Sequence, residues 1–432
     1  MQRATARVLD RRLPEAAALG TVFASSGFLL ATWASRVPAI RGQGGLAPGQ
    51  VALLLWALAC GYVLGLALSG PAVARVAAGR LLLWSSVTAC TALAWVGLDP
   101  RWRWRVAGLV VLGACGGLWE STMNLRAGRL EAETGRRVMP RLHAAFSTGG
   151  AAGLVCGGLA ARWHVPVGAH FPAAAGALGM LIAVALLGSR IGVEAGDGPR
   201  RAGRAAGTGS AWTDRRTLAL GVLLLGIATA EGAAADWLPL VLVDGYRQGQ
   251  ARAAAGLLLF VTAVIVARLA ASALPSAARG DRVLAAGLLL LTAGPLMLAS
   301  GDPSPSGGPR AVGGVLCWAA GVALGFPLIM SVAARAGRAA GGATDGVAPG
   351  ARVGAVSAIG YLGFMVGPLP IGWLAGRVGL TGALLAVPVV AGCAALAAAL
   401  CHPTPVRARL RSARQPAPDV GEQSLLDLVG GA

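Results

Sequence analysis

Long apolar stretches alternate with short polar ones along the whole chain. A helix that crosses a bilayer needs about 20 mostly apolar residues. Twelve stretches come close to that length, and they run roughly over Ala17–Ser35, Val51–Val73, Leu81–Leu98, Val106–Leu125, Ala144–Ala161, Ala169–Ile191, Leu218–Val243, Ala253–Leu274, Val283–Ser300, Ala311–Ala334, Val353–Leu374 and Leu380–Leu400. The pattern predicts an all-α integral membrane protein with twelve transmembrane helices.

The longest polar interruption, Gly192–Arg216, has six apolar stretches on each side. Gly, Arg and Ala dominate it, as is typical of a linker between two helical bundles. We therefore predict an N-terminal six-helix bundle over residues 1–192, a cytoplasmic linker over 193–216 and a C-terminal six-helix bundle over 217–401. The remainder, 402–432, combines arginines with Pro, Gly and acidic residues, which predicts a disordered cytoplasmic tail.

The charges support a membrane protein. Only 13% of the 432 residues are charged, whereas a soluble domain usually has about 25%. The net charge of +19 could indicate a nucleic-acid partner, but the basic residues are all arginines spread over the polar loops. With the N-terminus inside, 26 of the 37 arginines fall on the cytoplasmic side and 10 outside. The positive-inside rule then predicts a protein of the inner (cytoplasmic) membrane with both termini cytoplasmic, and no nucleic-acid partner.

Several other classes lack their sequence signals. The seven cysteines include no CxxC pair, so no metal site or disulfide framework is expected. No P-loop is present, which argues against ATP-driven transport. The four histidines are scattered over different loops, so the chain is not expected to be an enzyme or to need a cofactor. A non-transporting membrane sensor stays an alternative, although no soluble output domain is evident.

Charged side chains inside apolar stretches are expensive in a bilayer and usually mark function or pairing. Glu231 lies among small residues in AEGAAADW, and Asp236 follows five residues later. A buried carboxylate there suits proton coupling or solute binding. Asp236 could also be an exposed residue at the end of its helix. Both are candidate sites for the solute or the proton.

Arg268 is the one basic residue inside an apolar stretch, so we expect a carboxylate partner or a snorkelling position. Glu120 is the expected partner, because it and Arg268 lie at similar depths, whereas Glu231 is expected to lie too far away. Glu120 is also a candidate site for the solute or the proton. Asn124 is one turn away, so the two side chains share a face that lines a cavity or forms a structural pair. His143, at the start of the fifth stretch, is either a titrating gate or a structural residue.

Several segments together resemble the major facilitator superfamily, in particular its bacterial branch that includes YbjJ and MosC. They are GFLLATWASRVPAIRG, WESTMNLRAGRLE, RRVMPRLHAAFSTGGAAG, AEGAAADW and GYLGFMVGPLPIGWLAG. The resemblance implies two six-helix halves related by a pseudo-two-fold axis, with a central site lined chiefly by spans one, four, seven and ten. It also implies that spans two and eleven, and five and eight, meet across the halves.

The resemblance gives expectations for further residues. Trp33 becomes a candidate cavity contact. The superfamily's loop signature after the second span is degenerate here: Arg75 matches it as a gating candidate, but Ala74 replaces the acidic residue. Close-packing faces of glycines would serve as sliding contacts between the halves, or would reflect generic helix packing in a chain with 65 glycines; they comprise Gly149, Gly153 and Gly157, Gly61 and Gly65, and Gly363 and Gly367.

These observations predict a monomeric secondary transporter that moves a small polar solute across the lipid bilayer by alternating access. The proton is the expected coupling ion. The alternative within the same class is efflux of drugs or metabolites by antiport, which the low aromatic content of 5% disfavours.

Overall fold

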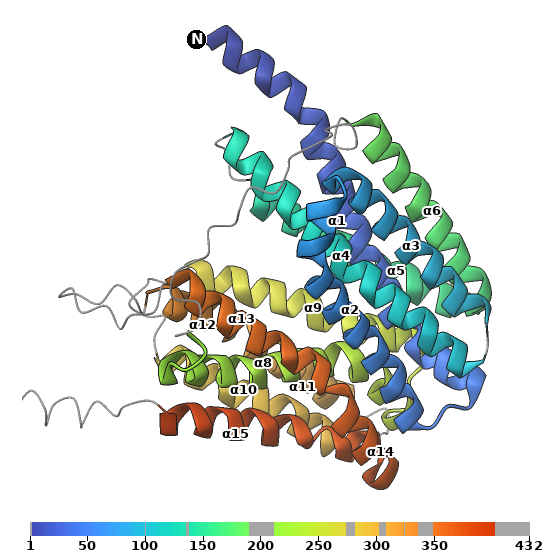
Figure 1. Cartoon of the computed structure of the whole chain (residues 1–432). Coiled ribbons are helices and arrows are strands. Elements are labelled where there is room, and N and C mark those ends of the chain that lie inside the picture. The colour runs from blue at the N-terminus through green and yellow to red at the C-terminus, as the bar shows by residue number, and fades with distance from the viewer. Residues whose placement is uncertain are drawn as a thin grey trace, which may run out of the picture.

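The structure, a computed structural model, describes residues 2–99, 101–134, 138–189, 211–273, 281–301, 308–323, 325–335 and 349–401, and this part of the chain is almost entirely helical (Figure 1). Most of the predicted linker and the whole predicted tail lie outside these residues. The helices are α1 (Gln2–Gly44), α2 (Pro48–Arg75), α3 (Ala78–Leu98), α4 (Trp102–Thr134), α5 (Met139–Arg162), α6 (Val167–Gly188), α8 (Arg215–Leu240), η2 (Val241–Gly245, a π-helix), α9 (Gln250–Ala273), α10 (Asp281–Ala299), α11 (Gly308–Ala323), α12 (Gly325–Arg335), α13 (Pro349–Val366), α14 (Pro368–Ala383) and α15 (Ala386–Cys401).

The predicted count of twelve spans agrees with these helices. Ten helical stretches in the described residues are long and apolar enough to cross a membrane, and two shorter apolar helices, Leu284–Ala299 and Ala386–Leu400, occupy the positions of the ninth and twelfth spans. The tenth span consists of α11 and α12, and most of the eleventh of α13 and α14. Glycine and proline set several boundaries. Gly45 follows α1 with a φ of 57°, and Pro48 opens α2, the positions at which these residues favour a helix end and a helix start.

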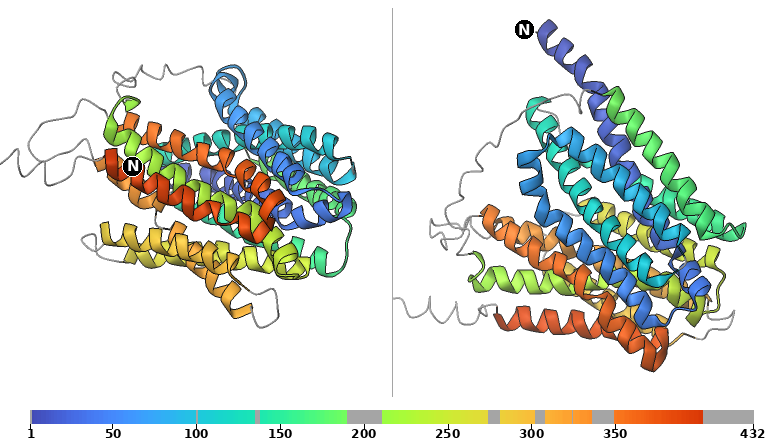
Figure 2. Two further views of the ribbon diagram at one scale, coloured as in Figure 1. Left: turned by 90° about the horizontal axis from the view of Figure 1, so that it is seen from below. Right: turned by 45° about the vertical axis from the view of Figure 1, so that its right-hand side comes forward.

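The two halves repeat the same packing scheme. In the first half α1 packs on α5, and α3 packs on both α4 and α6. Six spans later α8 packs on α13, and α10 packs on both α11 and α15. The right-hand view of Figure 2 shows the blue-to-green helices as one bundle beside the lime-to-red helices of the other. The two related halves that the resemblance implies are therefore present in the tertiary contacts.

The glycine faces pack within each half and not between the halves, which corrects the sequence prediction. A Cβ at Gly149 would overlap the carbonyl oxygen of Ala24 on α1. Gly61 on α2 is similarly close to Val110 on α4, and Gly363 on α13 lies against Leu225 of α8. These helices approach each other so closely that no side chain fits between them. The glycines therefore make each half rigid, because they fix the pairs α1·α5, α2·α4 and α8·α13.

The halves meet mainly through α5 with α9 and through α2 with α13 and α14, as expected for spans five with eight and two with eleven. Gly158 of α5 contacts Ala254 near the start of α9, and Gly372 of α14 lies against Pro48 at the start of α2. All these positions lie far from the end of the molecule at which α1 begins, which we call the N-terminal side. Toward the N-terminal side the helices of the two halves diverge (Figure 1).

An ion pair also joins the halves on the side opposite the N-terminal side. Arg41, in the last turn of α1, pairs with Asp244 of η2. Both side chains are partly exposed, at 23% and 36%, so water weakens the attraction. π-Helical turns are frequent at functional sites, and this one places the acidic partner opposite Arg41. The pair and the glycine contacts keep this side of the molecule closed.

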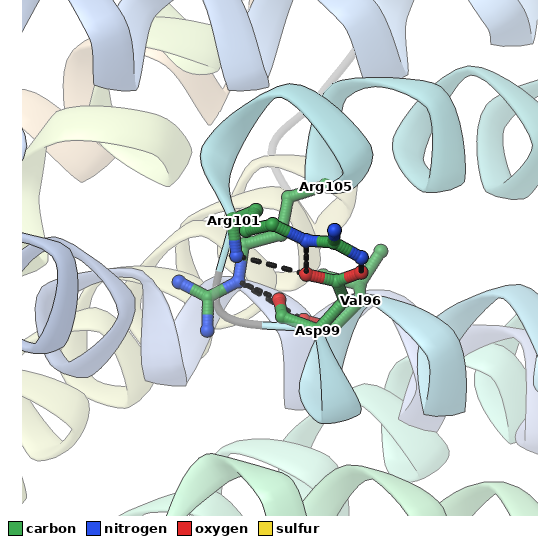
Figure 3. A network of polar contacts seen from close by, with 4 residues as sticks. All are labelled: Val96, Asp99, Arg101 and Arg105. Carbon is green, nitrogen blue, oxygen red and sulfur yellow. Dashed lines mark hydrogen bonds and ion pairs between the residues drawn. The ribbon is translucent and has the colours of Figure 1, made fainter.

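A polar network fixes the short connection between α3 and α4 (Figure 3). The guanidinium of Arg101 donates to both carboxylate oxygens of Asp99, at 3.0 and 2.8 Å. This hydrogen bonding lowers the pKa of Asp99 to about 2. The buried Arg105 donates from Nε to the carbonyl oxygens of Val96 and Asp99, at 3.2 and 2.9 Å. A cation at the C-terminal end of α3 satisfies carbonyls that have no partner within the helix.

Candidate functional site

A cavity of about 400 Å³ lies between the two halves. α1, α2 and α5 line it from the first half, and α8 and α9 from the second. Spans one and seven therefore contribute as expected, but spans two, five and eight take the places expected for four and ten. The volume is within the range of about 300–1,000 Å³ that is usual for small-molecule pockets.

Three charged side chains line the cavity: Glu231, Asp236 and Arg268. Arg268 donates from Nη2 to both carboxylate oxygens of Glu231, at 3.0 and 3.3 Å. The predicted pairing of Arg268 with Glu120 is therefore wrong. The estimate from helix depth failed because the long arginine side chain reaches a carboxylate on the neighbouring helix α8.

Arg268 has a second role at the break in the tenth span. Its Nε donates to the carbonyl oxygen of Ala323, the last residue of α11, at 3.0 Å. In a continuous helix this oxygen would accept from the residue four positions later, which is Pro327 and has no N–H. The arginine replaces the missing donor. A single side chain thus links Glu231 on α8 to the discontinuity between α11 and α12.

Asp236 lies on the cavity wall and is half-buried, so it is not simply an exposed residue at a helix end. Within the described part of the chain its carboxylate has no hydrogen bond and no ion pair. Trp33 also lines the cavity, as expected. It is 3% exposed and packs on Phe171 with the ring centroids 6.4 Å apart. Phe146 and Phe260 add two further aromatic rings to the lining.

Glu120 and Asn124 lie outside this cavity. The amide of Asn124 donates to the backbone carbonyl of Glu120 at 2.9 Å, so the link between them is local to α4. The Glu120 carboxylate makes no hydrogen bond or ion pair with any residue that the structure describes.

The predicted gating residues His143 and Arg75 lie away from the cavity. His143 is exposed, and its ring packs edge-on against Phe23 at 5.5 Å. Arg75 is exposed and donates to the carbonyl of Pro71 in its own helix, at 3.3 Å. Neither residue is among those that line the cavity.

Sequence reasoning missed three pairs that join helix ends. One is Arg41 with Asp244. The other two lie on the N-terminal side: Arg126 of α4 pairs with Glu15 of α1, and Arg352 of α13 with Asp214, the N-cap of α8. The signal was present, because each contributes an isolated charge at the edge of an apolar stretch. Only the fold could show which ends are neighbours.

The N-cap of α8 is a compact polar cluster. Asp214 accepts from the backbone N–H and the hydroxyl of Thr217, at 2.9 and 2.6 Å. Arg352 is fully buried and donates to the Thr217 hydroxyl at 3.1 Å. Burial alone would raise the pKa of Asp214, but the hydrogen bonds from Thr217 and the charge of Arg352 together lower it below its usual value. The cluster ties α8 to α13 where both enter the bundle.

Metal binding has no support in the described residues, where no group of three or more His, Cys, Asp or Glu could hold an ion. The chemistry that the cavity offers is that of an ion pair, an unpaired carboxylate and aromatic rings. Groups of this kind can bind and orient a solute or exchange protons with it, and none of them is arranged as a nucleophile with its base.

Relatives with similar sequences are transporters or membrane proteins. The chain is 28% identical over 378 residues to the uncharacterized transporter y4wD of Sinorhizobium fredii, covering 84% of this chain and 94% of that protein. It is 27% identical to an uncharacterized MFS-type transporter of Yersinia pestis, over 87% of this chain and 90% of the relative. It is 26% identical to the membrane protein MosC of Rhizobium meliloti, over 87% of this chain and 88% of MosC.

Solved structures share the fold. The nucleoside transporter NupG, as a D323A mutant, superposes with a TM-score of 0.73 at 10% identity, covering 90% of this chain and all of that one. A bacterial homologue of the human lysosomal transporter Spinster, inward-facing and unoccupied, superposes with a TM-score of 0.66 at 13% identity, covering 89% of this chain and 96% of that one. The family model of the Major Facilitator Superfamily matches residues 16–345. With its two repeated halves around a central cavity, the chain is a multi-pass membrane transporter that belongs to the major facilitator superfamily.

Proposed function

We propose that this transporter moves a small polar solute by proton-coupled alternating access, and that it works as a monomer in the cytoplasmic membrane with both termini inside. The observation that carries the proposal is the pair of Glu231 and Arg268 on the cavity wall. A solute in the cavity and a proton on the carboxylate can both act on this pair.

The distribution of arginines makes the N-terminal side the cytoplasmic one. The halves diverge on that side (Figure 1) and are held together on the other by Arg41 and Asp244, so the described conformation corresponds to an inward-facing one. A rocking movement that separates α1 from η2 would open the outer side. This movement can leave each half intact, because the close contacts of Gly149, Gly61 and Gly363 lie within the halves.

The hydrogen bonds of Arg268 to Glu231 and to Ala323 support coupling to protons. Protonation of Glu231 would remove the charge that holds the guanidinium, and Arg268 would remain bonded only to Ala323 at the break of the tenth span. A movement of Arg268 would therefore change the support of α11 and α12. A solute that competes for either group has the same effect, which links its binding to the helices of the second half.

The test is an electrical recording from proteoliposomes on a solid support, with sugars, polyols, amino acids, nucleosides and amines applied at pH 6 and pH 8. Coupled transport predicts solute-induced currents that depend on pH in the unaltered protein. In Glu231→Gln the pH dependence should disappear, while Glu133→Gln, which changes a carboxylate outside the cavity, should keep it. Currents of unchanged pH dependence in Glu231→Gln would refute the role of Glu231.

A further inference from the structure

We propose that the cavity selects solutes that carry a protonated amine, and that Asp236 binds the ammonium group. The inference rests on the proposed transport function and adds the chemical class of the solute. Three observations carry it: the charge balance of the lining, the unpaired state of Asp236 and the aromatic rings beside it.

The charge balance of the cavity is negative. Its lining contains two carboxylates, Glu231 and Asp236, and one guanidinium, Arg268. Arg268 is committed to both oxygens of Glu231 and to the carbonyl of Ala323. Its charge is therefore compensated, and one carboxylate is left over. An anionic solute would have to displace Glu231 from Arg268, whereas a cation finds Asp236 available.

Asp236 is placed where a carboxylate is costly without a partner. It lies within a membrane span, between Ala235 on the cavity wall and the fully buried Trp237. A carboxylate at such a depth usually pairs or serves a solute. No basic side chain that the structure describes pairs with it. The missing partner is then supplied by the solute, and a charge-assisted hydrogen bond to an ammonium group has the right geometry and charge.

The remaining lining suits the hydrocarbon part of such a solute. Trp33, Phe146 and Phe260 border the same space. Aromatic rings attract cations through their negative faces, and the attraction grows when water is excluded. The combination of one free carboxylate with three aromatic residues favours an amine on a compact ring or chain over an acid or a neutral polyol.

The test uses matched compounds that differ in the amine. Tyramine is compared with tyrosol, glucosamine with glucose, and cyclohexylamine with cyclohexanol, by thermal unfolding of the purified protein at constant ionic strength and pH 7. Ligands of the native state raise the apparent melting temperature. We expect at least one amine to raise it while its neutral counterpart does not. Asp236→Asn should weaken that amine's Kd about tenfold or more, the usual scale of a bond to a charged group.

Two control variants distinguish a loss of amine binding from a loss of folding. Asp236→Glu should retain most of the amine effect, and Asp99→Asn, which changes a carboxylate outside the cavity, should retain all of it. If Asp236→Asn does not fold, the unaltered protein is treated with dicyclohexylcarbodiimide, and tyramine but not tyrosol should slow the labelling of Asp236, measured by mass spectrometry.

Equal effects of amines and their neutral counterparts, no effect of any amine, or an amine effect that survives in Asp236→Asn would each overturn the inference. These outcomes are distinct from a failure of the transport proposal. A neutral solute that produces pH-dependent currents would support proton-coupled transport and refute the inference that the solute carries an amine. Amines that bind through Asp236 but never produce a current would support the amine site and refute the transport proposal.

Discussion

Replacing Gly149 by alanine tests whether the close contact between α1 and α5 holds the first half together. The added Cβ would overlap the carbonyl oxygen of Ala24, a backbone atom that cannot rotate away. Overpacking of this kind costs about 1–3 kcal/mol, and the upper end applies because two helices must separate. Alanine is a better helix former than glycine by about 1 kcal/mol. The net loss of stability is then about 2 kcal/mol.

Gly176→Ala is the matched control. Gly176 is an exposed residue of α6, and nothing lies within 4 Å of an added Cβ there. Only the gain in helix propensity remains, about 1 kcal/mol, so the two variants should differ by about 3 kcal/mol. For a chain of this length that corresponds to roughly 3–6 °C in melting temperature. Thermal unfolding in one detergent, read by intrinsic fluorescence, measures it. Melting temperatures equal within 1 °C, or a higher value for Gly149→Ala, would refute the rigid pairing of α1 with α5.

Three further predictions concern charged groups. A double-mutant cycle with Arg268→Met and Glu231→Gln should give a coupling of about 1 kcal/mol in thermal unfolding, because the pair is partly exposed; additive losses would mean that the pair contributes nothing. The melting temperature of the unaltered protein should exceed that of Asp99→Asn at neutral pH. Since the pKa of Asp99 is lowered to about 2 in the folded protein, this difference in melting temperature should shrink only as the pH falls below about 4. A constant difference down to pH 2 would contradict this. In a cysteine-free background, Arg41→Cys with Asp244→Cys should cross-link on oxidation and stop transport until a reductant is added. Full activity of the cross-linked protein would refute the proposal that α1 separates from η2 during transport.

The order and number of the spans were predictable from the sequence, because insertion into a bilayer is governed by local hydrophobicity and length. The longest polar interruption has six apolar stretches on each side, so the six-plus-six arrangement also followed. Glu231 and Asp236 could be selected as site candidates because a charge in an apolar stretch stands out by itself, and Trp33 was selected through the resemblance. Each of them lines the observed cavity.

The partners of those residues were decided by the tertiary structure. Helix depth assigned Arg268 to Glu120, but the rotation of each helix about its axis and the length of the arginine side chain brought it to Glu231. The same holds for Gly149, which faces α1 inside its own half, although its spacing fits a contact across the halves equally well. A sequence determines which faces of a helix are small, charged or apolar. Which neighbour meets each face depends on the packing of all helices together, and only the folded arrangement specifies it.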